Sequence, residues 1–293
     1  MSKNLENRLL FEEAKNNGKP LILDGAMGSL LQQHNVPVDS HLWMSKANID
    51  YPEIIKNIHN QYIEAGADII TTNTFRTNPA AVKKSDSISE ELVKQALFIA
   101  QNSARNTKVI IAGSNPPAED CYQKKRTLSN DEIENNHKAH IDLLIKYGSD
   151  FILNETQSQL DEIEIICKYC YSNKIQYVLS LYVNEELKIL SGEDVKDVID
   201  FILNYKPLAI GFNCTTISTF LDIYRNIELD FSWGMYLNCG DGSFSNVNIK
   251  CGVSPTEYAQ IIKNILDNSP LFVGACCGSS PEHIKKLKVM LDG

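Results

Sequence analysis

One pattern occurs twice in the chain, as Pro207-Leu208-Ala209-Ile210-Gly211-Phe212-Asn213-Cys214 and as Pro270-Leu271-Phe272-Val273-Gly274-Ala275-Cys276-Cys277. Each copy has a proline, then a short apolar run typical of a buried parallel strand, and then cysteine. In barrels built from parallel strands and helices, the residues that directly follow a strand form the site. The repeat therefore predicts a parallel sheet with thiols at its functional end.

Short apolar runs of the same kind recur along the whole chain, separated by longer amphipathic segments. We predict eight strands at residues 21–23, 69–72, 109–112, 151–153, 178–182, 208–212, 234–237 and 271–273. Each unit then has roughly 37 residues, enough for a strand, a helix and two loops. This alternation predicts an α/β fold, a single (β/α)8 TIM barrel domain over residues 1–293 with an N-terminal helix within residues 1–17.

Local signals at the ends of the predicted helices support this alternation. Ser129 and Glu132 form a capping-box pattern in front of a helix, and Ser280-Pro281-Glu282 opens the last one. Gly66-Ala67-Asp68 and Gly148-Ser149-Asp150 share a Gly-x-Asp turn that leads from a helix into a strand.

The composition restricts the kinds of partner. The chain has 293 residues, 43% of them hydrophobic, and a formal net charge of -9. An acidic chain is repelled by nucleic acid and by anionic membranes, so neither is expected as a partner. No apolar stretch approaches 18 residues and the N-terminus has no signal-peptide core. We expect a cytoplasmic protein; the sequence does not indicate its oligomeric state.

Three of the eight cysteines follow predicted strands six and eight. Alternate strands of a barrel point side chains into a common layer, so Cys214, Cys276 and Cys277 should converge. Three thiolates around Zn²⁺ leave a fourth tetrahedral position open, as in catalytic zinc sites. On spacing alone, three small buried residues at the mouth of the barrel are an equal alternative.

Other histidines and cysteines have simpler interpretations. Cys167 and Cys170 share an apolar helical stripe with neighbouring isoleucines, which indicates core packing. His137 and His140 lie on one face of a predicted helix and fit a packed or half-exposed face better than a ligand pair. Cys121 and Cys251 fall in predicted loops.

Six motifs in order span residues 23 to 284. They are Leu23-Asp24-Gly25-Ala26-Met27-Gly28, Ala65 through Phe75, Gly113-Ser114 with Glu119 through Tyr122, Glu155-Thr156, Gly211 through Cys214, and Gly274 through Gly278 with Pro281 through Ile284. Together they resemble the homocysteine S-methyltransferase family. The two cysteine motifs at strand ends are its most specific elements.

The resemblance implies a zinc-dependent barrel enzyme that methylates homocysteine to methionine, with Cys214, Cys276 and Cys277 as zinc ligands. It implies that Glu155 holds the substrate ammonium and that Asp24, with the backbone amides of Gly25 and Ala26, anchors the amino acid. Asn213 and Asn238 match family asparagines near the metal. The alternative is that the two acids only accept hydrogen bonds from nearby loop amides and that the two asparagines cap turns. Cys239 departs from the family pattern.

The methyl donor is the least defined part of this hypothesis. The chain ends soon after the eighth unit, and its His41-Leu42-Trp43 segment is similar to stand-alone members that use S-methylmethionine or S-adenosylmethionine. Betaine and a methyl group delivered by a partner protein stay open. Two other classes of function also stay open: a barrel hydrolase or lyase with a different metal set, and a non-catalytic zinc- or thiol-binding barrel.

Overall fold

The computed structural model of the protein describes residues 3–83, 85–240 and 249–293. Eight strands form one sheet: β1 (Leu21–Ile22), β2 (Ile69–Thr71), β3 (Ile110–Asn115), β4 (Phe151–Gln157), β5 (Tyr177–Leu181), β6 (Ala209–Asn213), β7 (Trp233–Leu237) and β8 (Phe272–Ala275). Their order is β1-β8-β7-β6-β5-β4-β3-β2 and every pair is parallel. A parallel bridge from Leu23 to Ile69 joins the two end strands and closes the barrel.

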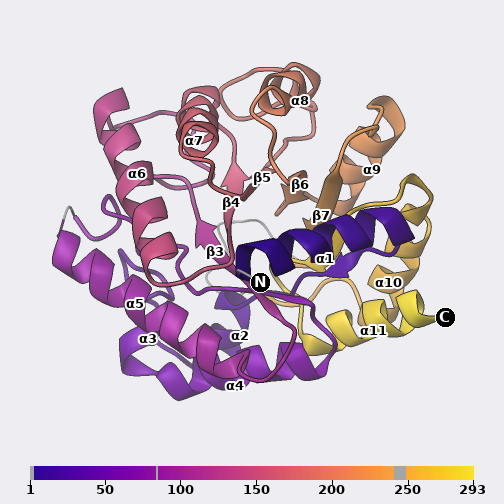
Figure 1. Cartoon of the computed structure of the whole chain (residues 1–293), viewed down its shortest axis with the longest axis horizontal. Coiled ribbons are helices and arrows are strands. Elements are labelled where there is room, and N and C mark those ends of the chain that lie inside the picture. The colour runs from indigo at the N-terminus through magenta and orange to yellow at the C-terminus, as the bar shows by residue number, and fades with distance from the viewer. Residues whose placement is uncertain (1–2, 84, 241–248) are drawn as a thin grey trace.

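Helices surround the strands in Figure 1. They are α1 (Lys3–Asn17), α2 (Gly28–Gln33), α3 (Ala47–Asp50), α4 (Pro52–Glu64), α5 (Asp86–Ser103), α6 (Asn130–Lys146), α7 (Leu160–Ser172), α8 (Val195–Leu203), α9 (Ile217–Asn226), α10 (Pro255–Lys263) and α11 (Pro281–Asp292), with a short 3₁₀ turn at Leu266–Asn268. The predicted (β/α)8 barrel and its N-terminal helix are therefore confirmed. The capping box of Ser129 and Glu132 opens α6 as the sequence indicated.

The repeated Gly-x-Asp turns have a structural purpose. Gly66 and Gly148 adopt φ angles of 100° and 92°, which favour glycine and reverse the chain after a helix. The aspartate two residues later accepts a hydrogen bond of 2.8 Å from the backbone amide of a neighbouring strand. For Asp68 the donor is Ile22, and for Asp150 it is Ile111. Each turn therefore fixes the start of its own strand against the neighbouring one.

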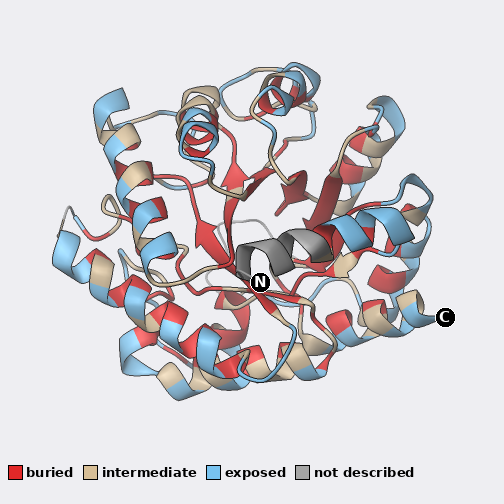
Figure 2. Ribbon diagram, in the orientation of Figure 1, coloured by how far each residue is buried: buried red, intermediate tan, exposed pale blue. Residues whose placement is uncertain are grey.

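The barrel interior is an apolar cluster, which α1 closes at the N-terminal ends of the strands. Phe11 of α1 packs edge-on against Phe151 at the start of β4, with ring centroids 5.3 Å apart. In Figure 1 α1 lies across this end, and Figure 2 shows buried strands inside helices whose outer faces are exposed. With α1 covering this end, ligands have to enter at the carboxyl ends of the strands, as in other barrels of this kind.

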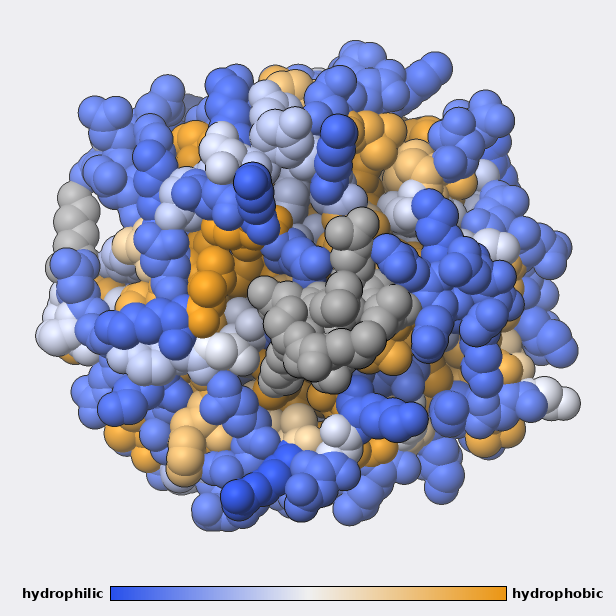
Figure 3. All heavy atoms as spheres, in the orientation of Figure 1, coloured by the Kyte–Doolittle hydropathy of each residue, from blue (hydrophilic) through white to orange (hydrophobic). Residues whose placement is uncertain are grey.

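Hydrophilic side chains dominate the face shown in Figure 3. Over the ranges that the structure describes, none of the helices combines the length and the apolar character that crossing a bilayer requires.

Candidate metal centre and substrate cavity

Three cysteine thiols meet at the carboxyl ends of β6 and β8. The Sγ atoms of Cys214, Cys276 and Cys277 lie within 4.8 Å of one another, and no other such ligand cluster occurs in the described part of the chain. The structure therefore brings together the three residues that the repeated strand pattern placed at one end of the barrel.

The donor set and its spacing fit a thiolate-binding metal. Zinc–sulfur bonds of about 2.3 Å in a tetrahedron separate the sulfur atoms by about 3.8 Å. The Sγ atoms of Cys276 and Cys277 are 3.9 Å apart. Hydrogen bonds from Cys214 and Cys276 lower the pKa of Cys277 well below its ordinary value, whereas contacts with its two neighbours raise the pKa of Cys276. Three thiolates this close repel one another, so full ionisation requires a cation between them.

Two residues of the site, Cys214 and Thr156, have a left-handed backbone conformation. Cys214 has a φ of 54°, and Thr156, which follows Glu155 in β4, has a φ of 59°. For a β-branched residue such as Thr156 this left-handed conformation is rare, and strain of this kind is concentrated at functional sites. The Asn213 side chain bonds Thr156 twice: its amide nitrogen donates to the threonine hydroxyl (2.8 Å) and its oxygen accepts from the backbone amide (2.9 Å).

Asn213 was expected near the metal as a substrate contact, and the structure gives it other partners. Its amide nitrogen also lies 3.4 Å from Cys214 Sγ, and the residue is fully buried behind the cavity. The positive φ angles could not be read from sequence pattern, because neither residue is a glycine or an asparagine, the types that signal this conformation.

Two carboxylates, the buried Asp24 and the half-buried Glu155, share the cavity with the thiols. Both Asp24 oxygens accept hydrogen bonds of 2.8 Å from Thr71, one from its amide and one from its hydroxyl. Glu155 accepts a short hydrogen bond from Ser114 Oγ, and Tyr236 Oη lies 3.5 Å from its second oxygen. Burial raises the pKa of Asp24 to about 8 and that of Glu155 to about 7. Among the residues that the structure describes, no cationic side chain pairs with either carboxylate, and an ammonium group would supply that charge.

A cavity of about 760 Å³ connects these groups. The three thiols, Asp24, Glu155, Gly25, Ala26 and Asn238 all line it. The Ala26 amide donates to Ser279 Oγ (3.0 Å), and the Asn238 side-chain oxygen accepts from the Gly240 amide (2.7 Å). These two groups are therefore already engaged, whereas the two acids accept hydrogen bonds and have no cationic partner within the described part of the chain.

The other cysteines lie outside the cluster. Cys167 and Cys170 are fully buried in the core, as their helical stripe indicated. Cys239 is also buried and contacts the Leu237 carbonyl oxygen at 3.6 Å, and Cys251 is exposed. Cys121 lines the cavity, a position that its loop location in the sequence did not reveal.

Comparison with known proteins gives consistent matches over nearly the whole chain. The family model described as homocysteine S-methyltransferase matches residues 21–291. Homocysteine S-methyltransferase YbgG of Bacillus subtilis (strain 168) is 25% identical over 91% of this chain and 93% of its own. Homocysteine S-methyltransferase of Escherichia coli (strain K12) is 23% identical over 92% and 94%. The crystal structure of the Escherichia coli homocysteine methyltransferase MmuM in its metallated form has a TM-score of 0.77 at 21% identity, covers 92% of this chain and 96% of that one, and shares the fold.

Proposed function

The chain belongs to the homocysteine S-methyltransferase family, and from this premise we propose that it transfers a methyl group from a small donor to homocysteine in a zinc-dependent reaction. The observation that carries the proposal is the cluster of Cys214, Cys276 and Cys277 in a cavity that Asp24 and Glu155 also line. We assign zinc binding and methyl transfer to one domain over residues 1–293. Free cysteines throughout the described chain agree with a reducing, cytoplasmic location.

In this proposal Glu155 and Asp24 bind the ammonium group of homocysteine. Thr71 fixes both oxygens of Asp24, and Ser114 fixes one oxygen of Glu155, so neither acid has to reorganise when the substrate enters. Gly25 and Asn238 also line the cavity, and we assign them to the amino-acid site.

A free thiol of pKa about 8.5 is ionised only to a few per cent at neutral pH. A Zn²⁺ ion held by Cys214, Cys276 and Cys277 would keep the homocysteine sulfur in its ionised form. Asn213 and the left-handed backbone of Cys214 keep the Cys214 thiol directed at the cluster.

We propose S-methylmethionine or S-adenosylmethionine as the donor. Both carry a sulfonium cation, and three thiolates with one Zn²⁺ have a formal charge of about -1 that attracts it. Betaine, whose quaternary ammonium group is also cationic, is the next candidate, and a partner-delivered methyl group is the outcome if no small donor reacts.

The test combines metal content with activity. The reduced protein should contain about one zinc per chain and should methylate homocysteine when S-methylmethionine, S-adenosylmethionine and betaine are assayed in parallel. Cys214→Ala and Cys277→Ala should lose both zinc and activity, whereas the control Cys251→Ser, an exposed thiol outside the cluster, should keep both. Full activity without zinc, or without the three cysteines, would exclude the proposal. A zinc protein that is inactive with every donor would favour the non-catalytic barrel.

A further inference from the structure

One wall of the cavity is a single loop segment between β3 and α6, residues 118–128, which we call the wall segment. It presents Cys121, Tyr122 and Gln123 to the cavity. The Tyr122 ring packs edge-on against Tyr182 after β5, with centroids 5.2 Å apart. Because this segment has no regular secondary structure, its position depends on side chains from neighbouring elements.

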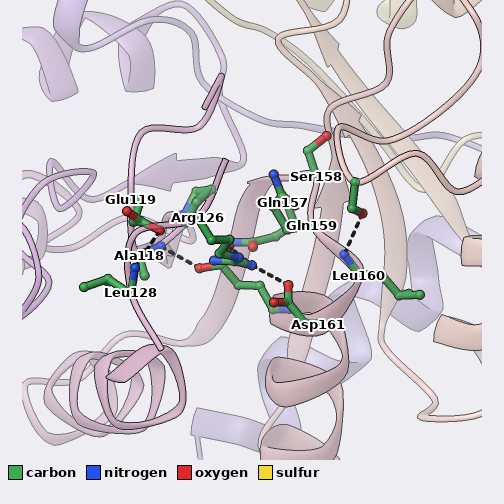
Figure 4. Close-up of polar contacts among 12 residues, drawn as sticks. Ala118, Glu119, Arg126, Leu128, Gln157, Ser158, Gln159, Leu160 and Asp161 are labelled. Atoms are coloured by element: carbon green, nitrogen blue, oxygen red, sulfur yellow. Dashed lines mark hydrogen bonds and ion pairs between the residues drawn. The ribbon is translucent and has the colours of Figure 1, made fainter. Parts of the chain in front are cut away.

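The Glu162 carboxylate binds both ends of the wall segment. Glu162 lies in α7 and its side chain is only 1% exposed. One oxygen accepts a hydrogen bond of 2.6 Å from the Ala118 amide, and the other lies 3.2 Å from Arg126 Nη2. The same Arg126 nitrogen also contacts Asp161 (Figure 4). A single carboxylate therefore joins two points that are eight residues apart in the loop.

The carboxylate is itself fixed from behind. His137 Nε2 of α6 lies 2.7 Å from the Glu162 oxygen that binds Ala118, and His137 Nδ1 lies 3.0 Å from the Asn115 amide nitrogen at the end of β3. The side chains of Glu162, His137 and Asn115 are all buried. Burial would raise the pKa of Glu162, yet its contacts with His137 and Arg126 hold this pKa below the ordinary value. Glu162 is therefore ionised and has partners for both oxygens, and His137 and Asn115 connect it to β3.

Contacts within the wall segment make it a closed loop between these anchors. The Glu119 carboxylate accepts hydrogen bonds from the Thr127 amide (3.0 Å) and from the Gln123 side chain (3.0 Å). From the opposite side, Arg76 donates to the Glu119 carbonyl oxygen (3.1 Å). Release of one end therefore alters the whole segment, including the residues that face the cavity.

We propose that Glu162 is a positioning residue of the donor side of the cavity, acting through Ala118 and Arg126 to hold the wall segment against the reacting groups. This inference rests on the proposed function. Homocysteine would be held by Asp24, which follows β1, and by Glu155, which lies in β4. Among the interactions that the structure describes, neither acid contacts Glu162. Loosening the wall segment should therefore affect the donor more than homocysteine.

The test uses the zinc-loaded enzyme with S-methylmethionine as probe donor. Arg126→Met and Glu162→Gln each remove the ion pair between Arg126 and Glu162. Arg126→Lys restores the positive charge at position 126. Arg225→Met is the matched control, because Arg225 pairs with Asp222 at the exposed surface of α9. We expect the KM for S-methylmethionine to rise about tenfold in Arg126→Met and Glu162→Gln, with the KM for homocysteine within about twofold. Arg126→Lys should recover part of the loss and Arg225→Met should show none.

A second readout does not depend on methyl transfer. Cys121 lines the cavity but is only 9% exposed, so its alkylation by iodoacetamide, followed by mass spectrometry, reports whether the wall segment is closed. We expect at least a tenfold faster modification of Cys121 in Arg126→Met and Glu162→Gln, with Cys167 in the core unreactive. Unchanged Cys121 modification, or equal rises in both KM values, would overturn the positioning role. If the wild type transfers no methyl group, the proposed function fails, and the alkylation rates still decide whether Glu162 holds the wall segment.

Discussion

Replacing Glu155 with glutamine tests the proposed substrate anchor directly. The substitution removes the charge and preserves the size, and the amide oxygen can still accept the hydrogen bond from Ser114. A hydrogen bond to a charged group in a partly buried site contributes about 2 kcal/mol, which corresponds to about a 30-fold rise in the KM for homocysteine when Glu155 is ionised. The zinc content should not change, because Glu155 is outside the thiol cluster.

The raised pKa of Glu155 makes this effect depend on pH. With a pKa of about 7, Glu155 in the free enzyme is ionised to about 10% at pH 6 and about 90% at pH 8. Only the ionised form of Glu155 binds an ammonium group more tightly than the glutamine side chain of the variant does. The ratio of the KM of Glu155→Gln to that of the wild type should therefore rise from about 3 at pH 6 to about 30 at pH 8. Titration of the homocysteine thiol affects both enzymes equally and cancels in the ratio.

Steady-state kinetics at saturating donor, at half-unit steps from pH 6 to pH 8, measures this ratio. Glu164→Gln is the control, because Glu164 is an exposed carboxylate on α7 paired with Lys168, and its ratio should stay near one. A Glu155→Gln ratio that is large but constant with pH would refute the reasoning from the pKa. A ratio of one throughout would remove Glu155 from the substrate site.

Three further substitutions test the cavity and the barrel. Burial raises the pKa of Asp24 to about 8, so the folded, ligand-free protein retains a proton that the unfolded chain releases; the contribution of Asp24 to stability should fall between about pH 4 and pH 8 by at most about 1.4 kcal/mol per unit. Asp24→Asn should remove this contribution, so the difference in stability between variant and wild type in thermal denaturation should change with pH, whereas a constant difference would contradict it. A Cβ at Gly28 would overlap the Trp43 ring in the cavity wall, so Gly28→Ala should displace the ring and lower kcat/KM at least about tenfold; normal kinetics would contradict a role for the ring position. A Cβ at Gly234 would lie 2.5 Å from the Phe272 ring inside the barrel, so Gly234→Ala should cost about 1 to 3 kcal/mol in urea unfolding, and a stability equal to wild type would contradict this packing.

The architecture was predictable because its signals are local. Each strand is a short apolar run between polar segments, and the Gly-x-Asp turns mark where helices give way to β2 and β4. The strand-end position of Cys214 and of Cys276 and Cys277 was enough to place them at one end of the barrel, because alternate parallel strands direct side chains into one layer.

The contacts that hold the site together were not predictable, because they join residues distant in sequence. Glu162 reads as an ordinary helical glutamate, yet it is buried and binds Ala118, which lies 44 positions away. Asn213 bonds Thr156 over 57 positions, and this pairing depends on two residues with positive φ that no residue type signalled. Cys121 reaches the cavity only because the wall segment folds inward. A single sequence carries no pairing information of this kind.

The charges of the cavity favour a zwitterionic amino acid over a neutral thiol. The proposed zinc ion with its three thiolates would carry a formal charge of about -1, and ionisation of both Asp24 and Glu155 would add two more negative charges in the same cavity. Burial instead raises the pKa of both acids to about 8 and about 7, so that at neutral pH they hold part of their protons. An entering ammonium group replaces those protons, and its binding should release them to solvent. A neutral thiol such as 2-mercaptoethanol offers no cation in exchange, and we therefore expect it to be a poor methyl acceptor even though its sulfur could reach the same position.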